Sequence, residues 1–202
     1  MNKTISLAGC ALAALALAAC GDKETGGATD QQNQPVNAVQ DHAAGVVGSV
    51  AAPVGATTDA GFVTNAAIGG MYEVEAGRIA ADRSRNAAIK TLGRKMVTDH
   101  TAAGEELKAV ASGQNLTVPT ALDERRQGMI DNLRGAPDQD FDRVYLQQQE
   151  AAHNETAALL GAFNQMDGNA ALKAWSAKTL PVITGHQRMI DALDEADADA
   201  PN

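Results

Sequence analysis

The stretch IKTLGRKMVTDHTAAGEELKAV, residues 89–110, decides the fold of this chain. Apolar residues and one histidine recur in it at intervals of three and four, which is the spacing of one face of an α-helix. These residues are Ile89, Leu92, Met96, His100, Ala103, Leu107 and Val110. Ser84 or Asn86 can cap the start of this helix, and Ser112-Gly113 can end it. The stretch therefore predicts a long amphipathic helix whose apolar face packs against other helices.

The same helical spacing continues on both sides of this stretch, from residue 58 onward, without a convincing run of period two. It predicts four more helices, whose ends are marked by capping and turn residues. The first of these helices begins near Thr58 or Asp59. The second runs from Pro119-Thr120 to Arg134-Gly135, and the third runs from Pro137-Asp138 to Asp167-Gly168. The fourth follows that turn and has a kink at Pro181. Gly69-Gly70 in the first helix predicts a close approach or a bend of its backbone.

The lengths of the connections predict how these helices are arranged. Very short links join the first two long helices and the last two, so each pair forms an antiparallel hairpin. The link between the hairpins is long enough to cross the bundle, and it contains the short helix. Two hairpins joined by a crossover are the arrangement of ferritin-like folds. We therefore predict an all-α, ferritin-like up-down four-helix bundle with a short crossover helix over residues 58–196.

Three histidines lie on the apolar stripes of three different long helices: His100, His153 and His186. The helical rise places each about 20 to 30 Å from its hairpin turn, near the middle of a bundle about 40 Å long. Neutral imidazole is a ligand of zinc, copper and iron. We therefore expect three inward imidazoles at one level, as candidate ligands of a transition metal.

The carboxylate ligands of such a site are less clear. Glu150 stands three residues before His153, which is the Glu-x-x-His spacing of carboxylate-bridged di-iron bundles. Val97 and Ile183 occupy the matching positions before the other two histidines. A complete di-iron centre is therefore not expected. Glu150 stays a candidate ligand of a simpler site.

The first long helix offers a second candidate carboxylate, Glu73, although periodicity does not settle whether Glu73 or Glu75 points inward. Met96 and Met189 lie one helical turn from histidines, so a histidine–methionine copper site is a variant. The structural alternative is that each histidine forms an ordinary hydrogen bond in the core. Candidate partners for such bonds are Asp142, Tyr145 and Glu73.

Composition excludes several classes of function. The net charge of −9 and the isoelectric point near 4.8 argue against a nucleic-acid partner. No phosphate-binding glycine loop or Gly-x-Ser-x-Gly motif is present. The only cysteines are Cys10 and Cys20, near the N-terminus, so the helical region has no cysteine nucleophile. Enzymatic activity is therefore not expected.

The N-terminal residues have the layout of a secretory signal, with Lys3 followed by an apolar run over residues 5–19. The sequence Leu17-Ala18-Ala19-Cys20 resembles the lipobox of bacterial lipoproteins. This resemblance implies that residues 1–19 are removed and that Cys20 carries lipid, including palmitate. Gly21 replaces the aspartate that retains lipoproteins in the inner membrane of enteric bacteria, which favours the outer membrane. The acidic chain would be repelled by anionic head groups, so the lipid is the expected membrane anchor.

Residues 20–57 contain no aromatic residue and are dominated by small and polar residues. Such a composition cannot bury enough apolar surface to fold, so we predict a flexible tether between the lipidated cysteine and the bundle. Its root-mean-square reach would be roughly 30 to 35 Å. At the other end, residues 197–202 are predicted to form a disordered tail.

Several motifs in this order and spacing resemble a large bacterial family catalogued as domain of unknown function 4142 and often labelled outer membrane protein. They are Phe62, Tyr72-Glu73-Val74-Glu75-Ala76-Gly77, Ala80, Met96-Val97-Thr98-Asp99-His100, Phe141-Asp142-Arg143-Val144-Tyr145, His153, and Leu180-Pro181 followed by His186. The resemblance covers about residues 58–193 and implies an exported ferritin-like bundle. It implies no activity. Asn154 departs from the family pattern, where Glu or Gln follows the histidine.

Two functional hypotheses follow from these features. The first is a cell-envelope lipoprotein whose periplasmic bundle has a binding or structural role, with an envelope protein as a possible partner. The second is a periplasmic bundle that binds zinc, copper or iron through its inward histidines. The distance between the imidazole rings discriminates between them, because rings more than about 8 Å apart cannot share one ion with bonds of 2.0 to 2.1 Å.

Overall fold

The computed structural model describes residues 58–198, which form five α-helices and no strand. The helices are α2 (Asp59–Arg83), α3 (Ala87–Gly113), α4 (Glu124–Gly135), α5 (Phe141–Gln165) and α6 (Ala170–Ala198). None of these five helices has the length and hydropathy needed to span a membrane. The prediction of an all-α helical bundle is therefore confirmed. The predicted signal peptide, lipidated Cys20 and tether lie outside the described residues, as does the predicted tail beyond residue 198.

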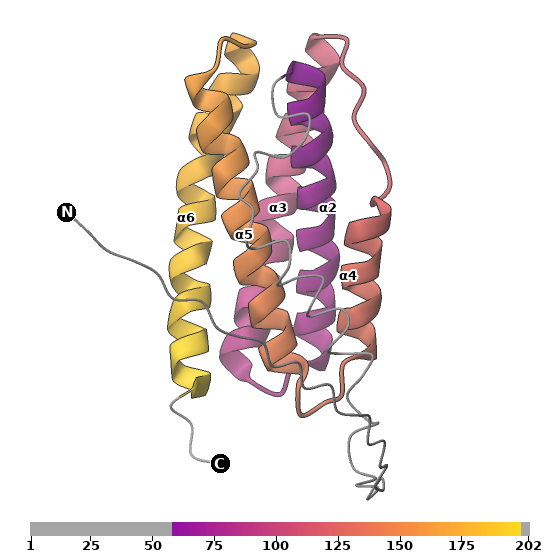
Figure 1. The fold of residues 1–202 in the computed structure, drawn as a ribbon, viewed down its shortest axis with the longest axis vertical. Helices are drawn as coiled ribbons and strands as arrows, with labels where there is room; N and C mark the ends of the chain where they lie inside the picture. The colour runs from indigo at the N-terminus through magenta and orange to yellow at the C-terminus, as the bar shows by residue number, and fades with distance from the viewer. Residues whose placement is uncertain (1–57, 199–202) are drawn as a thin grey trace, which may run out of the picture. The chain divides into compact units, whose positions relative to one another are not determined.

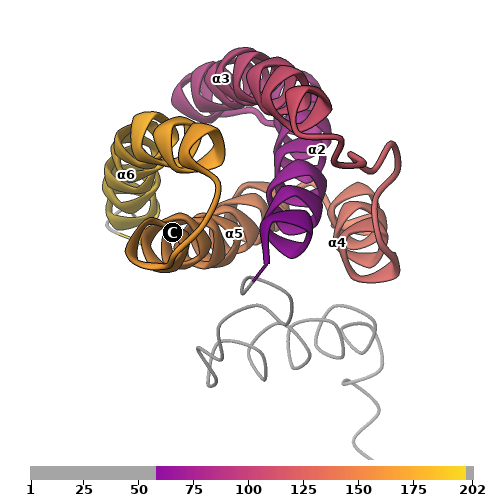
Figure 2. The same ribbon diagram turned by 90° about the horizontal axis from the view of Figure 1, so that it is seen from above.

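The four long helices form a ring in the order α2, α3, α6 and α5 (Figures 1 and 2). The hairpin partners α2 and α3 pack together, as do α5 and α6, and the ring closes through contacts of α3 with α6 and of α2 with α5. The chain between the hairpins runs along the outside of the bundle, and its helix α4 covers α2 and α5 (Figure 2). The predicted topology of two hairpins joined by a crossover helix is therefore present.

Side-chain caps fix where the first three of these helices begin. The Thr58 Oγ1 accepts a hydrogen bond from the Gly61 N–H at 3.0 Å, and the Asn86 Oδ1 accepts one from Ala88 at 2.8 Å. Asn86 is one of the two caps that the sequence predicts for α3, and Thr58 lies where the first helix is predicted to begin. In α4 the cap is Asp123, whose carboxylate accepts the N–H of Arg126 at 2.7 Å. Each cap satisfies an N–H group that has no partner within its own helix.

Two helices begin later than the sequence predicts. Helix α4 starts at Glu124 instead of Pro119-Thr120, because residues 116–123 form the irregular chain that leads from α3 to α4. Helix α5 starts at Phe141 instead of Pro137-Asp138. The Asp138 carboxylate is an ion-pair partner of Arg83 at 3.1 Å and of Arg85 at 2.9 Å, so it ties this turn to the end of α2.

Helices α2 and α3 approach each other closely at a pair of glycines. A Cβ atom built on Gly77 of α2 would lie 2.7 Å from the carbonyl oxygen of Gly93, and one on Gly93 of α3 would lie 2.6 Å from that of Gly77. No real side chain tolerates such distances, so the α2–α3 hairpin requires glycine at both positions. At Gly69 the nearest atom is an ordinary 3.8 Å away, and Gly70 has no neighbour within 4 Å. The close approach predicted at Gly69-Gly70 is therefore found at Gly77 and Gly93.

The core consists of two apolar clusters separated by a polar layer. One cluster contains Leu92 and Met96 of α3, and the other contains Leu107 of the same helix. His100 lies between them in the sequence, and the histidines of α5 and α6 likewise fall between residues of the two clusters. The polar layer therefore crosses the interior of the bundle partway along its length.

Candidate metal centre

The three predicted histidines meet in the polar layer. His100 from α3, His153 from α5 and His186 from α6 are 7 %, 1 % and 0 % exposed. Their ring centroids are separated by 5.5 Å, 5.3 Å and 5.3 Å. One nitrogen from each ring can be chosen so that all three lie within 4.8 Å of one another. The expectation of three inward imidazoles at one level is therefore confirmed, and their spacing passes the 8 Å test.

His153 and His186 are the closest pair, with Nε2 of His153 lying 3.2 Å from Nδ1 of His186. The outer nitrogen of each ring faces an acceptor. His153 Nδ1 lies 3.0 Å from the backbone carbonyl of Gln149, and His186 Nε2 lies 2.8 Å from the carboxylate of Asp99. Because a carbonyl and an ionised carboxylate only accept hydrogen bonds, we assign the proton of each neutral ring to its outer nitrogen. The two inner nitrogens then present lone pairs to each other.

His100 completes this arrangement from the third side. Its Nε2 is buried and has no hydrogen-bond partner among the described residues. A buried polar atom without a partner costs about 1 to 3 kcal/mol. The cluster therefore contains an unpartnered nitrogen of His100 and two opposed lone pairs, on His153 Nε2 and His186 Nδ1. A cation bound among the rings would interact with all three nitrogens.

Burial keeps the three rings neutral. Desolvation lowers the pKa of His153 to about 4, even though the hydrogen bond to the Gln149 carbonyl opposes this shift. Desolvation, together with the neighbouring imidazoles, lowers the pKa of His100 well below its usual value. It also lowers the pKa of His186, with partial opposition from Asp99. At neutral pH the site therefore offers three uncharged nitrogen donors, which is the form that binds metals.

Asp99 is the residue that orients His186. It is half-buried, and its Oδ2 accepts hydrogen bonds from His186 and from Lys95 Nζ, each at 2.8 Å. Desolvation alone would raise the pKa of Asp99, but the bonds from Lys95 and His186 outweigh it and lower the pKa. A carboxylate on the outer nitrogen of a histidine fixes its tautomer and raises its basicity as a metal ligand. The sequence does not indicate this role, because Asp99 stands beside the apolar stripe of α3 and not on it.

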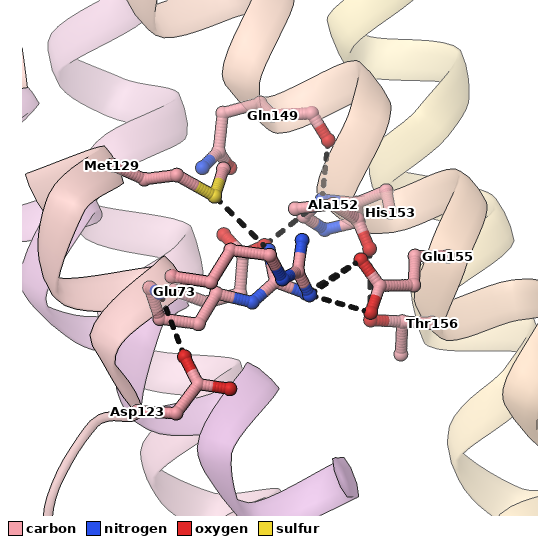
Figure 3. Close-up of polar contacts among 10 residues, drawn as sticks. Glu73, Asp123, Met129, Gln149, Ala152, His153, Glu155 and Thr156 are labelled. Atoms are coloured by element: carbon pink, nitrogen blue, oxygen red, sulfur yellow. Dashed lines mark hydrogen bonds and ion pairs between the residues drawn. The ribbon is translucent and has the colours of Figure 1, made fainter. Parts of the chain in front are cut away.

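Glu73 of α2 is the second carboxylate of the layer, and Figure 3 shows it beside His153. It is 1 % exposed, and its Oε1 lies 3.5 Å from Nδ1 of His153, the outer nitrogen. Neither oxygen accepts a hydrogen bond from a described residue. Desolvation raises its pKa to about 7, although the Gln149 side chain and the Arg126 charge partly oppose this. Glu73 therefore places a carboxyl group at the outer side of the His153 ring, and this group carries its negative charge only as the pH rises above about 7.

Crossover helix α4 contributes a buried cation to the same region. Arg126 is 3 % exposed, and its Nη2 lies 3.0 Å from the Glu155 carboxylate of α5. Its guanidinium carbon lies 5.0 Å from the ring centroid of Tyr72. Figure 3 shows Glu155 and Glu73 in the same cluster of polar contacts. Arg126 therefore joins α4 to α2 and α5 next to the histidine layer.

The remaining predicted residues do not join the cluster. Glu150 is exposed on α5, because Gln149 instead shares the inward face with His153. Met96 is fully buried in an apolar cluster, and Met189 is partly buried. Tyr145 and Asp142, expected as alternative partners of the histidines, form no hydrogen bond to them, since Tyr145 Oη and Asp142 Oδ1 are buried without a partner.

A groove between α3 and α6 leads to the site. It encloses about 430 Å³, and both His100 and His186 line it. Lys95 and Asp99 lie on its α3 side and Lys178 on its α6 side, and Lys178 Nζ is 2.6 Å from the carboxylate of Glu106. The groove therefore brings the surface close to two of the three histidines, although His186 is 0 % exposed and Nε2 of His100 is buried.

Comparison with known proteins identifies the family of this chain but no activity. Residues 44–193 match a family model described as a domain of unknown function (DUF4142). No curated protein and no solved structure matches the chain. Its function has to be inferred from the geometry of the histidine layer.

Proposed function

The chain belongs to the DUF4142 family, and from its histidine layer we propose that its bundle binds one divalent transition-metal ion through His100, His153 and His186. The observation that carries the proposal is the 3.2 Å separation of His153 Nε2 and His186 Nδ1. Two nitrogens bound to one zinc ion at 2.0 to 2.1 Å in tetrahedral geometry lie about 3.3 Å apart. The pair thus has the spacing of two ligands of one ion.

A shared proton is the other way to reconcile these two opposed lone pairs. Burial disfavours it, because desolvation lowers the pKa of both rings below the usual value for histidine. A metal ion instead forms bonds to neutral rings. The carboxylates of Asp99 and Glu73 on the outer side of the cluster supply a compensating negative field. Both features favour a cation between the rings.

The donor set limits which metals are suitable. Three imidazoles without a thiolate suit zinc, copper, iron and neighbouring first-row ions, whereas magnesium and calcium prefer oxygen ligands. Among the divalent ions, Cu²⁺ is expected to bind more tightly than Zn²⁺. In the cell, metal availability then decides which ion occupies the site.

Metal analysis of the full chain, purified in detergent, tests the proposal. After incubation with Zn²⁺ or Cu²⁺ and removal of excess metal, we expect one ion per chain and a higher melting temperature. Replacement of His100, His153 or His186 by Gln, which keeps much of the side-chain volume, should abolish stoichiometric binding. His42→Gln, which changes the histidine outside the described residues, is the matched control. Circular dichroism establishes that each variant is folded.

Two outcomes would overturn this proposal. One is the absence of bound metal and of any thermal shift in the wild-type chain. The other is stoichiometric binding that survives replacement of all three histidines in a chain that circular dichroism shows to be helical.

We also propose a location for this bundle, on the basis of the N-terminal sequence alone. Residues 1–19 would direct export, and Cys20 would carry the lipid that holds the protein at the outer membrane with the bundle in the periplasm. There the bundle would bind metal or an envelope protein. Metabolic labelling with palmitate should mark the wild-type chain and leave Cys20→Ala unlabelled. An unlabelled wild-type chain in a bacterium that labels its other lipoproteins would refute the anchor.

A further inference from the structure

Within the described part of the chain, three histidines are the ligands of the proposed ion. Among residues 58–198, no other histidine, cysteine or carboxylate joins the cluster of His100, His153 and His186. Asp99 and Glu73 contact the outer nitrogens of His186 and His153, on the far side of each ring from the shared centre. Zinc sites with three protein ligands keep a position that takes water or an external molecule. The geometry of the layer thus leaves one coordination position to be filled from outside.

The groove between α3 and α6 is the part of the surface that comes closest to that position in this pair of helices, although the nitrogen Nε2 of His100 is itself buried. Two of the three ligands, His100 and His186, lie on its wall. Most of the remaining lining is apolar or small and is contributed by Ala102, Ala103, Val182, Ile183, Gly185 and Met189. The polar part of this remaining lining consists of Lys95, Asp99, Glu106, Lys178 and Thr179.

We propose that a small anion with a single donor atom enters through this groove and occupies the fourth position on the ion. The inference rests on the proposed metal site. Three neutral imidazoles leave a divalent ion with its full positive charge, and the apolar lining strengthens attraction to an anion. The two lysines at the groove, Lys95 and Lys178, are each paired with a carboxylate, so their positive charges are balanced locally. Hydroxide, halides and azide belong to the class of ligand that fits.

Cobalt and azide provide the test, because the visible spectrum of Co²⁺ reports its coordination. The full chain is loaded with Co²⁺ and then titrated with azide. We expect a saturable change in the cobalt bands of the wild-type protein. If Co²⁺ fails to bind, the proposed function fails. If Co²⁺ binds and saturating azide leaves the spectrum unchanged, the metal site stands and the open position is refuted.

A variant that fills the groove tests whether azide reaches the ion through it. A Cβ on Gly185 would meet no atom within 4 Å, so Gly185→Leu adds bulk to the groove wall in open space. It should retain Co²⁺ and raise the apparent Kd for azide at least about tenfold through steric exclusion. Gly128→Leu is the matched control, because Gly128 lies in α4, away from the groove, and also has open space around it. Its azide response should equal that of the wild type.

A second variant keeps the test decisive if Gly185→Leu perturbs the adjacent His186. Val182 is 41 % exposed and lines the same groove, so Val182→Trp narrows it from a position one helical turn before His186 instead of beside it in the sequence. Retention of the full azide response in both variants would refute the route. Met189 also lines the groove, and its sulfur is an internal competitor for the fourth position. Two results together would show that the Met189 sulfur occupies the fourth position: Met189→Leu changes the cobalt spectrum in the absence of azide, and azide leaves the wild-type spectrum unchanged. The inference would then be wrong.

Discussion

His153 Nε2 and His186 Nδ1 face each other across 3.2 Å at the centre of the bundle, while an acceptor holds the outer nitrogen of each ring. If either ring changed to the other tautomer, it would lose the hydrogen bond from its outer nitrogen to the Gln149 carbonyl or the Asp99 carboxylate. The fold therefore keeps two lone pairs facing each other, and one nitrogen of His100 lies within 4.8 Å of one nitrogen in each of these two rings. This relationship determines how the site should respond to changes in pH and in the residues around it.

Metal binding should persist to lower pH than is usual for a three-histidine site. With ordinary histidine pKa values, affinity would fall about a thousandfold between pH 7.5 and 5.5, because three rings must lose protons. Here burial lowers all three pKa values, that of His153 to about 4. We expect the Kd for Zn²⁺, measured by competition with a chelator, to rise less than about tenfold over this range. A loss that follows the titration of free imidazole would contradict the burial argument.

Glu73→Gln should stabilise the metal-free protein at high pH and leave it unchanged at low pH. The carboxyl group has a pKa of about 7 in the folded state against 4.5 in the unfolded state. Its contribution to stability is therefore fully present below pH 4.5 and is lost as the pH rises through 7. A shift of this size corresponds to about 3 kcal/mol. Urea denaturation at pH 4.5 and pH 8 measures it, and an equal effect at both pH values would contradict the prediction.

Asp99→Asn should weaken metal binding without removing it. Loss of the carboxylate on His186 Nε2 reduces the basicity and the fixed orientation of that ring, which typically costs 10- to 100-fold in affinity. Glu106→Gln is the matched control, because Glu106 lines the same groove and pairs with Lys178 instead of a histidine. Isothermal titration with Zn²⁺ compares the two. Equal affinities in the two variants would show that Asp99 does not position the ligand.

Gly77→Ala should destabilise the bundle by about 2 kcal/mol or more, because the added methyl group forces α2 and α3 apart. A Cβ atom built on Gly77 lies 2.7 Å from the Gly93 carbonyl oxygen, and this backbone atom cannot move aside as a flexible side chain could. Gly70→Ala, seven residues earlier on the same helix, meets no atom within 4 Å and should stabilise by about 0.5 to 1 kcal/mol. Thermal denaturation of both variants checks the pair, and a neutral Gly77→Ala would place the close approach elsewhere.

Sequence periodicity predicted the helices, the hairpins and the inward side of each histidine, because one face of a helix must be apolar wherever it packs. Periodicity also made Glu150 a candidate ligand, because residues three apart lie on the same broad face of a helix. This spacing does not show which of the two side chains is buried. In α5 that face is rotated so that Gln149 and His153 point inward. Nothing in the local pattern of α5 fixes this rotation, because it depends on how α2 and α6 pack against it.

The sequence by itself determined that this chain forms a helical bundle with three histidines on its core faces. Only the packing of the helices decides that one nitrogen of each ring lies within 4.8 Å of the other two, that Asp99 and Glu73 lie at the outer nitrogens, and that His100 and His186 line the groove between α3 and α6. The physical reason is that periodicity fixes which side of a helix is buried. The rotation and distance of neighbouring helices depend on contacts between segments far apart in the chain, such as that of Gly77 with Gly93.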